Sequence, residues 1–191
     1  MKIKRKLDDQ EEEEKDDEIV HIQGNIYFYA EVNSKNILKL IQCINEANIL
    51  VFNTQDSISH MKIKLYINSG GGDAFAGLSG LDHIRNNKIH ITTIADGFVA
   101  SAATLLLLGG HSRWALQNSR ILIHQLSTGF WGKYVDLLDE VQNSKELMNA
   151  FKEIYSSQTS IDNRKIQQLL KKELHLNSKQ AFEAGFISKI I

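Results

Sequence analysis

Strand-like and helix-like segments alternate along most of the chain, and this order limits its possible folds more than any other feature. Short runs rich in β-branched and aromatic residues, at 61–69 and 89–97, are each followed by a segment with apolar residues at helical spacing. Such alternation predicts a layered α/β domain in which helices connect neighbouring strands. The 191 residues suffice for one large core but are few for two. The expected helices cover 34–49, 74–86, 101–108, 135–157, 162–170 and 178–184.

The first 18 residues differ from the rest of the chain in charge. After a short basic start, residues 8–18 hold nine acidic residues and one lysine, so like charges repel along this block. We therefore expect residues 1–18 to form an acidic, disordered leader, followed by one domain over 19–191. The leader is either a solvated tail or an arm for interaction or gating, and its composition fits both.

Composition excludes several classes of function. The chain after the leader has only a small positive excess and no basic stretch interleaved with aromatic residues, so we expect no nucleic-acid partner. Its longest apolar run, Leu105–Leu108, is too short to cross a membrane, and no secretory signal is visible. The single cysteine, Cys43, fits a reducing compartment, the cytoplasm or its plastid or viral-host equivalent. We expect neither a bound metal nor a cofactor.

Two glycine-containing junctions lie between an expected strand and an expected helix, where unpaired backbone N–H groups can bind an anion. The first, at 68–73, reads Asn-Ser-Gly-Gly-Gly-Asp and fits a plain tight turn or a phosphate loop, although no Gly-Lys-Ser/Thr follows it. The second, at 97–103, sets Ser101 among small residues where a strand gives way to an apolar helix. Ser101 is there either a helix N-cap or a nucleophile at the positive end of the helix dipole.

A serine nucleophile needs a base, and His124 is the best placed of the seven histidines. It ends the apolar run at 120–123 and precedes a turn, so its ring can face a cleft. A histidine at a strand end is by itself more often structural than catalytic. Together, however, Ser101 and His124 favour nucleophilic catalysis.

Three separate motifs, in this order, resemble the ClpP family, the proteolytic subunit of the Clp protease and a family of serine peptidases. They read YINSGGGDAFAGL at 66–78, DGFVASAATLLLLGG at 96–110 and NSRILIHQ at 118–125. The resemblance can be followed from about residue 22 to residue 191. It implies the ClpP/crotonase fold, a spiral of β-β-α units in a single domain with a protruding handle helix, and protomers that assemble into two stacked seven-membered rings.

The resemblance also implies roles for individual residues. Ser101 is the nucleophile and His124 the general base, while the backbone N–H groups of Gly72 and Ala102 form the oxyanion hole. Two fixed donors of this kind stabilise the developing negative charge of acyl transfer. The residues implied to hold an extended peptide by strand addition are Gly71, Gly72, Gln125 and Leu126.

The third member of the catalytic triad is an aspartate in the family, and an ungapped match from residue 118 puts Glu173 there. Glutamate keeps the carboxylate but adds a methylene, and it fills this role on other folds. We expect Glu173 to complete the triad. Asp162 is a weaker substitute, and a degraded triad is the third possibility.

Other departures from the family concern its partners. The apolar pocket where an AAA+ unfoldase docks keeps Tyr66, but the matching positions Lys64 and Asn86 are polar. The charged pair that couples the two rings reads Lys171-Lys172. The helix at 135–157 matches the ring-stacking handle and stays amphipathic. We therefore expect a homo-oligomer, a heptameric ring or double ring, with an altered docking pocket for an unfoldase.

These observations lead to one preferred function and three alternatives. The preferred one is a serine endopeptidase that hydrolyses peptides or unfolded proteins inside an oligomeric chamber. A catalytically weak subunit, acting in a mixed ring or as a scaffold, is the main alternative. A crotonase-type acyl-CoA enzyme would not explain Ser101 and His124, and a serine–lysine dyad is unnecessary because His124 already supplies the base.

Overall fold

The structure is a computed structural model that describes residues 18–53 and 62–191. The acidic leader, apart from Glu18, and residues 54–61 lie outside the described residues. Glu18 itself belongs to the first strand and pairs with Tyr29.

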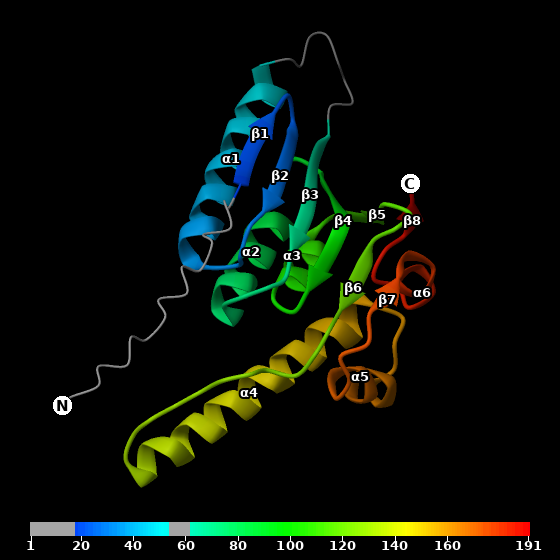
Figure 1. Ribbon diagram of the computed structural model, residues 1–191. Coiled ribbons are helices and arrows are strands. Elements are labelled where there is room, and N and C mark those ends of the chain that lie inside the picture. Colours follow the sequence, from blue (N-terminus) through cyan, green and yellow to red (C-terminus); the bar gives the residue numbers. More distant parts are fainter. Residues whose placement is uncertain (1–17, 54–61) are drawn as a thin grey trace, which may run out of the picture.

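The described chain forms one mixed sheet of eight strands (Figure 1). Its main path runs β1-β2-β3-β4-β5-β8, while β6 pairs with β4, and β7 pairs with β6. The pairs β1–β2 and β6–β7 are antiparallel, and the others are parallel. The strands are β1 (Glu18–Ile22), β2 (Asn25–Tyr29), β3 (Ile63–Ser69), β4 (Ile91–Ala100), β5 (Ser112–Ala115), β6 (Arg120–Leu122), β7 (Leu176–Asn177) and β8 (Lys189–Ile190).

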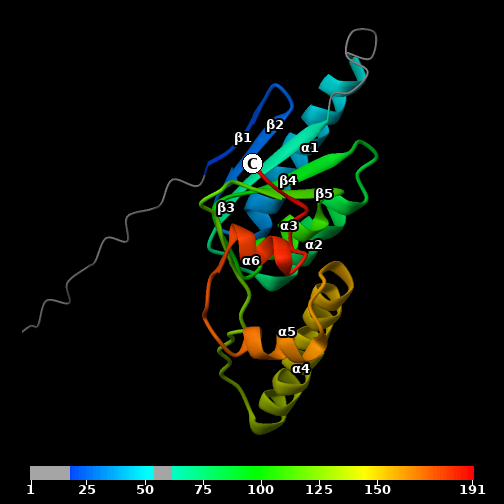
Figure 2. The ribbon, with the colours of Figure 1, turned by 90° about the vertical axis from the view of Figure 1, so that its right-hand side faces the viewer.

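Three helices, at 34–53, 74–85 and 103–109, cover one face of this sheet, and the core lies between them and the strands (Figures 1 and 2). In β3, Ile63, Leu65 and Ile67 are fully buried, because alternate residues of a strand point to the same face. The layered α/β fold predicted from the alternating segments is confirmed. The helices are α1 (Ser34–Asn53), α2 (Ala74–Arg85), α3 (Ala103–Gly109), α4 (Tyr134–Gln158), α5 (Asn163–Leu170) and α6 (Ser178–Glu183).

The expected end of the fourth strand at Gly97 is wrong. β4 continues to Ala100, and Gly97 adopts a φ of 82° within it. Before this glycine, residues 92–95 pair with β5; after it, residues 98–100 pair with β6. Gly97 therefore bends the strand so that it changes partners, since glycine accepts a positive φ without steric cost. The bend allows the strand to lead directly into Ser101.

Helix α4 meets the rest of the domain through its C-terminal half, where Phe151 and Tyr155 are its buried residues. The other half projects from the domain (Figures 1 and 2). Exposed apolar side chains gather on this part and on the segment before it, where Trp131 is 98% exposed. We name this set the handle surface: Phe130, Trp131, Tyr134, Val135, Leu137, Leu138 and Val141.

Cys43 is buried in α1. Burial raises the pKa of its thiol, so the reactive thiolate is disfavoured.

Candidate functional site

A cavity of about 160 Å³ lies where β4 leads into α3, and it brings most of the expected site residues together. Ser101 and Ala102 come from this junction, Gly72 from the turn before α2, and His124 from the segment after β6. Residues far apart in the sequence thus line one enclosed space. Its other lining residues are Ala74, Leu105, Gln125, Leu126, Ser127, Phe151 and Tyr155.

Ser101 adopts a left-handed backbone conformation, with a φ of 54°. Such a conformation costs a residue other than glycine on the order of 1–3 kcal/mol and is concentrated at functional sites. The N-cap role is wrong: α3 is capped by Ala102, without a side-chain hydrogen bond. Within residues 18–53 and 62–191, the Ser101 hydroxyl has no hydrogen-bond partner. This strained turn from strand to helix presents a free hydroxyl to the cavity, as nucleophilic serines on other α/β folds do.

Gly71 lies directly against this serine. Its φ is 101°, and a Cβ at this position would lie 2.6 Å from Ser101 Cβ and 2.8 Å from the Ala100 carbonyl oxygen. The turn is held by Val32, whose N–H donates to the Gly71 carbonyl at 2.8 Å and whose carbonyl accepts from Asp73 N–H at 2.7 Å. Gly71 thus packs directly against the backbone around Ser101 and leaves no room there for a side chain of its own.

The phosphate-loop interpretation of the same turn is not supported. The Asp73 carboxylate caps α2 and accepts a hydrogen bond from Ala76 N–H at 2.7 Å. A negative side chain therefore occupies the helix N-terminus, where a phosphate would otherwise bind.

The two backbone N–H groups expected to form an oxyanion hole are available. Gly72 and Ala102 both line the cavity beside Ser101. In the part of the chain that the structure describes, neither N–H donates to a protein acceptor. Two free donors near a free serine hydroxyl can stabilise an oxyanion that forms on a substrate attacked by that hydroxyl.

His124 is half-buried, and its ring makes no hydrogen bond to the other described residues. The segment that carries it is fixed by its neighbours, because Gln125 N–H donates to the Leu170 carbonyl at 2.9 Å. Leu126 N–H donates to Met148 Sδ at 3.0 Å. Both N–H groups are thus already used, so a peptide added along this segment would donate its own N–H groups to the carbonyl oxygens of the segment.

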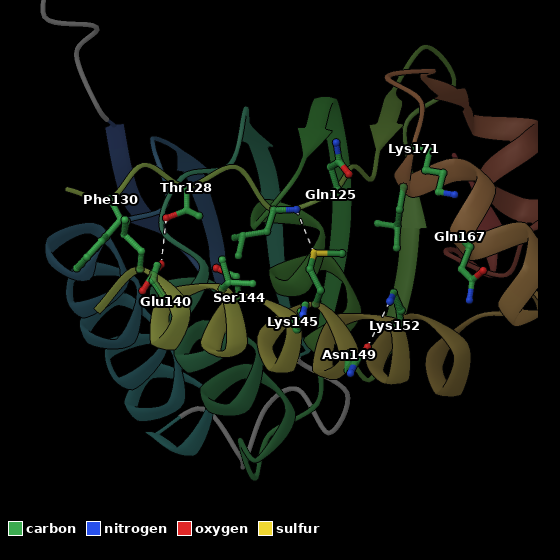
Figure 3. Close-up of a pocket in the computed structure, with 15 residues that line it drawn as sticks. Gln125, Thr128, Phe130, Glu140, Ser144, Lys145, Asn149, Lys152, Gln167 and Lys171 are labelled. Carbon is green, nitrogen blue, oxygen red and sulfur yellow. Dashed lines mark hydrogen bonds between the residues drawn. The ribbon is translucent and has the colours of Figure 1, made fainter. Parts of the chain in front are cut away.

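Two open grooves adjoin the cavity. One, of about 660 Å³, runs between residues 72–75 and residues 126–128, with α4 forming its third wall. The other, of about 910 Å³, lies between residues 125–130, α4 and α5, and both lysines and apolar side chains line it (Figure 3). The first groove is lined by Gly72 on one side and Leu126 on the other, as a bound extended peptide requires.

Neither of the two carboxylates considered as partners of His124, those of Glu173 and Asp162, is hydrogen-bonded to its ring. Glu173 is exposed, on the segment between α5 and β7. Because Ile121 pairs with Leu176 in an antiparallel ladder, the same register continued along both segments would set Glu173 opposite His124. The ladder ends at Leu176, and no described carboxylate is hydrogen-bonded to His124. Asp162 is unsuited as a substitute, since it caps α5 and accepts from Lys165 N–H at 2.7 Å.

The positions expected to bind an unfoldase lie away from this cavity. The Tyr66 ring stacks on Tyr27, with centroids 4.9 Å apart, and Lys64 lies on the same side of β3. Asn86 caps the end of α2 and donates to the Asp82 carbonyl at 2.9 Å.

Sequence analysis missed Thr104, which is hydrogen-bonded to the Ser101 carbonyl, and Tyr155, which is hydrogen-bonded to Thr104. Thr104 lies within an apolar run and Tyr155 within the amphipathic helix expected at 135–157, so neither stands out in the sequence. The signal was weak, because the side chains that meet here stand 51 residues apart and no short motif joins them.

Among residues 18–53 and 62–191, no three histidine, cysteine, aspartate or glutamate side chains are grouped so that they could hold a metal ion. None of the described helices combines the length and hydropathy needed to cross a membrane.

Comparisons with known proteins find similar sequences. The sequence model of a family described as Clp protease matches residues 11–191. The chain is also similar to the ATP-dependent Clp protease proteolytic subunit of Deinococcus radiodurans. The two are 32% identical over 147 residues, which cover 76% of this chain and 71% of the relative.

Proposed function

The chain belongs to the Clp protease family, and from this premise we propose that it is a serine endopeptidase that hydrolyses peptides or unfolded proteins inside an oligomeric chamber. The observation that carries the proposal is the strained, unbonded Ser101 in the same cavity as His124. Covalent labelling of Ser101 in the full chain by a fluorophosphonate tests it, and absence of labelling in the assembled protein would count against it.

The proposed reaction uses groups of this chain alone. His124 takes the hydroxyl proton of Ser101 while the serine oxygen attacks the scissile carbonyl carbon. Gly72 and Ala102 donate their N–H groups to the resulting oxyanion. The C–N bond breaks as His124 returns the proton to the leaving amine, and a water molecule, deprotonated by His124, then hydrolyses the acyl-serine ester. One such oxyanion donor is worth on the order of 10²–10³ in rate on other folds.

Substrate binding is proposed for the groove of about 660 Å³ beside the cavity. An extended peptide there would lie between Gly71 and Gly72 on one side and Gln125 and Leu126 on the other. Main-chain hydrogen bonds give affinity in this mode without strict demands on side chains. We propose an AAA+ unfoldase as the source of unfolded chains, acting on the face around Tyr66, which differs from the family through Lys64 and Asn86.

Assembly is supported by the handle surface. Seven large apolar side chains exposed along α4 and the segment before it are typical of a surface that another protomer covers. We expect sedimentation velocity of the full chain to show a ring of seven copies of the 21.6 kDa chain, about 150 kDa, or twice that for two stacked rings. A species of one chain at micromolar concentration would contradict the chamber. Lys171 and Lys172, both exposed, would repel the same pair of a second ring, which favours the single ring.

A second candidate is a catalytically weak subunit acting in a mixed ring or as a scaffold. Its support is that no described carboxylate is hydrogen-bonded to His124. Peptidase assays on the isolated chain, and on a mixture with an active relative, separate the two. Cleavage by the isolated chain at a rate similar to that of the relative would exclude the scaffold.

Replacement of Glu173 decides between a complete and a degraded triad. If Glu173 orients His124, Glu173→Gln lowers kcat by as much as about 10⁴, because the imidazole then adopts the wrong tautomer. Asp162→Asn is the matched control: it weakens a helix cap, at roughly 1 kcal/mol or less, without a change in rate. Steady-state kinetics and thermal melting measure both. An unchanged kcat in Glu173→Gln would support the degraded triad.

A further inference from the structure

The hydroxyl groups of Thr104 and Tyr155 connect α4 to the backbone of Ser101. Thr104 Oγ1 donates to the Ser101 carbonyl oxygen at 2.6 Å, and Thr104 N–H donates to the same oxygen at 3.0 Å. Thr104 Oγ1 also lies 2.8 Å from the Tyr155 hydroxyl. The threonine has one hydroxyl proton and gives it to the carbonyl, which can only accept. The Tyr155 hydroxyl is therefore the donor in the second bond.

This chain of hydrogen bonds has one direction, from Tyr155 through Thr104 to Ser101. Thr104 is fully buried and Tyr155 is 3% exposed, so water does not compete for either hydroxyl. Burial raises the pKa of Tyr155 to about 12, which keeps the phenol protonated and able to donate. Hydrogen bonds that follow one another in a dry environment strengthen each other.

A threonine hydroxyl that bonds the carbonyl three residues earlier is common at helix ends and is often only local structure. Two observations set Thr104 apart. Its acceptor belongs to the residue with the strained φ of 54°, and its own oxygen accepts from a side chain 51 residues away. On the other side, Ser101 N–H donates to the Leu122 carbonyl at 2.9 Å, two residues before His124. The serine is therefore fixed at both of its backbone polar groups.

We propose that Thr104 and Tyr155 are positioning residues for catalysis: their hydroxyls hold the Ser101 carbonyl and thereby keep the serine in the left-handed conformation that aims its Oγ at the substrate. The inference rests on the proposed role of Ser101 as nucleophile. Neither hydroxyl touches the substrate. Because a displacement of about 1 Å at a reacting atom can cost on the order of 10² in rate, such a bond matters far more for rate than for folding.

The first test compares variants that keep or remove the threonine hydroxyl. Thr104→Val keeps the shape and loses the hydroxyl, and we expect its second-order rate constant for fluorophosphonate labelling to fall by about 10- to 100-fold. Thr104→Ser loses a buried methyl but keeps the hydroxyl, and we expect a rate within about threefold of the unaltered chain. A merely structural role predicts the reverse order, since the serine variant creates the cavity.

The matched control is Thr93→Val. Thr93 is also fully buried, and its Oγ1 donates to the Leu107 carbonyl at 2.7 Å, near the far end of the same helix α3. We expect a similar loss of melting temperature but an unchanged labelling rate. Tyr155→Phe should lower the rate less than Thr104→Val, and the double variant should fall no lower than Thr104→Val alone, because the two hydroxyls act in series. Equal labelling rates in Thr104→Val and Thr93→Val would overturn the proposal.

A crystal structure of Thr104→Val gives a readout that does not depend on activity. We expect the Ser101 carbonyl to turn and φ to leave the left-handed region. Retention of both overturns the positioning role, even where labelling of the unaltered chain supports the proposed peptidase. Complete absence of labelling in the unaltered chain would instead remove the nucleophile, and with it the proposed function and the role of this network in catalysis.

Discussion

Ser101→Ala is expected to abolish fluorophosphonate labelling and to lower the kcat for peptide hydrolysis by on the order of 10⁶, the loss seen when a serine nucleophile is removed from a working triad. We expect this loss because, among the described residues that line the cavity, Ser101 combines a strained backbone with a hydroxyl that makes no hydrogen bond. His124→Ala should cost about as much, and the double variant no more than either, because the two groups act as a unit. Intact-mass spectrometry of the labelled chain and steady-state kinetics measure these losses.

The control for this experiment is another serine. Ser156 is on α4 and does not line the cavity, and its Oγ donates a local hydrogen bond to the Glu153 carbonyl. Ser156→Ala should label and cleave like the unaltered chain. Labelling that persists in Ser101→Ala would place the nucleophile elsewhere, and the proposed function would then lose its main support.

Gly71→Ala is expected to inactivate the site although it replaces none of the reacting groups. The added methyl would lie 2.6 Å from Ser101 Cβ and 2.8 Å from the Ala100 carbonyl oxygen, and both atoms belong to the junction between β4 and α3. Either the glycine turn or the serine must move. We expect a labelling rate at least about 10² lower, together with a loss of about 2 kcal/mol or more in the free energy of unfolding.

The neighbouring Gly70 makes a close control. Its φ lies outside the left-handed region, and a Cβ there would meet no atom within 4 Å. Gly70→Ala should therefore keep both the labelling rate and the melting temperature, or raise the latter slightly through a less flexible unfolded chain. Similar losses in both variants would show that the turn tolerates no side chain for reasons unrelated to Ser101.

Much of the fold was predictable because periodicity reports burial directly. Helix α1 begins at Ser34, and α2 begins at Ala74, as the spacing of apolar residues predicts, and the family fold of β-β-α units with a protruding helix is the one observed. The error at Gly97 has a clear cause. A glycine within a strand pattern usually ends the strand or marks a bend, and only the positions of β5 and β6 decide between the two.

In the site, short sequence motifs predicted the residues whose positions depend on local backbone geometry. The other contacts of the site depend on tertiary packing and could not be predicted in this way. Ser101, Gly72 and Ala102 lie at strand-to-helix junctions that the sequence marks with glycine and small residues. The contact of Gly71 with Ser101, and of Tyr155 with Thr104, depends on how separate segments pack, which no local pattern contains. Glu173 illustrates the same limit, because an ungapped match fixes its position along the chain but not the direction of its side chain.

The anchoring of α4 at one end has a mechanical consequence. A helix of 25 residues is about 37 Å long, and its two buried side chains, Phe151 and Tyr155, lie near one end. A tilt of about 5° at the anchored end therefore displaces the free end of the helix by roughly 3 Å, with only small movements around Phe151 and Tyr155. In the proposed ring, neighbouring protomers could therefore differ in how the free ends of their α4 helices meet while the serine and its supporting hydroxyls keep the same arrangement.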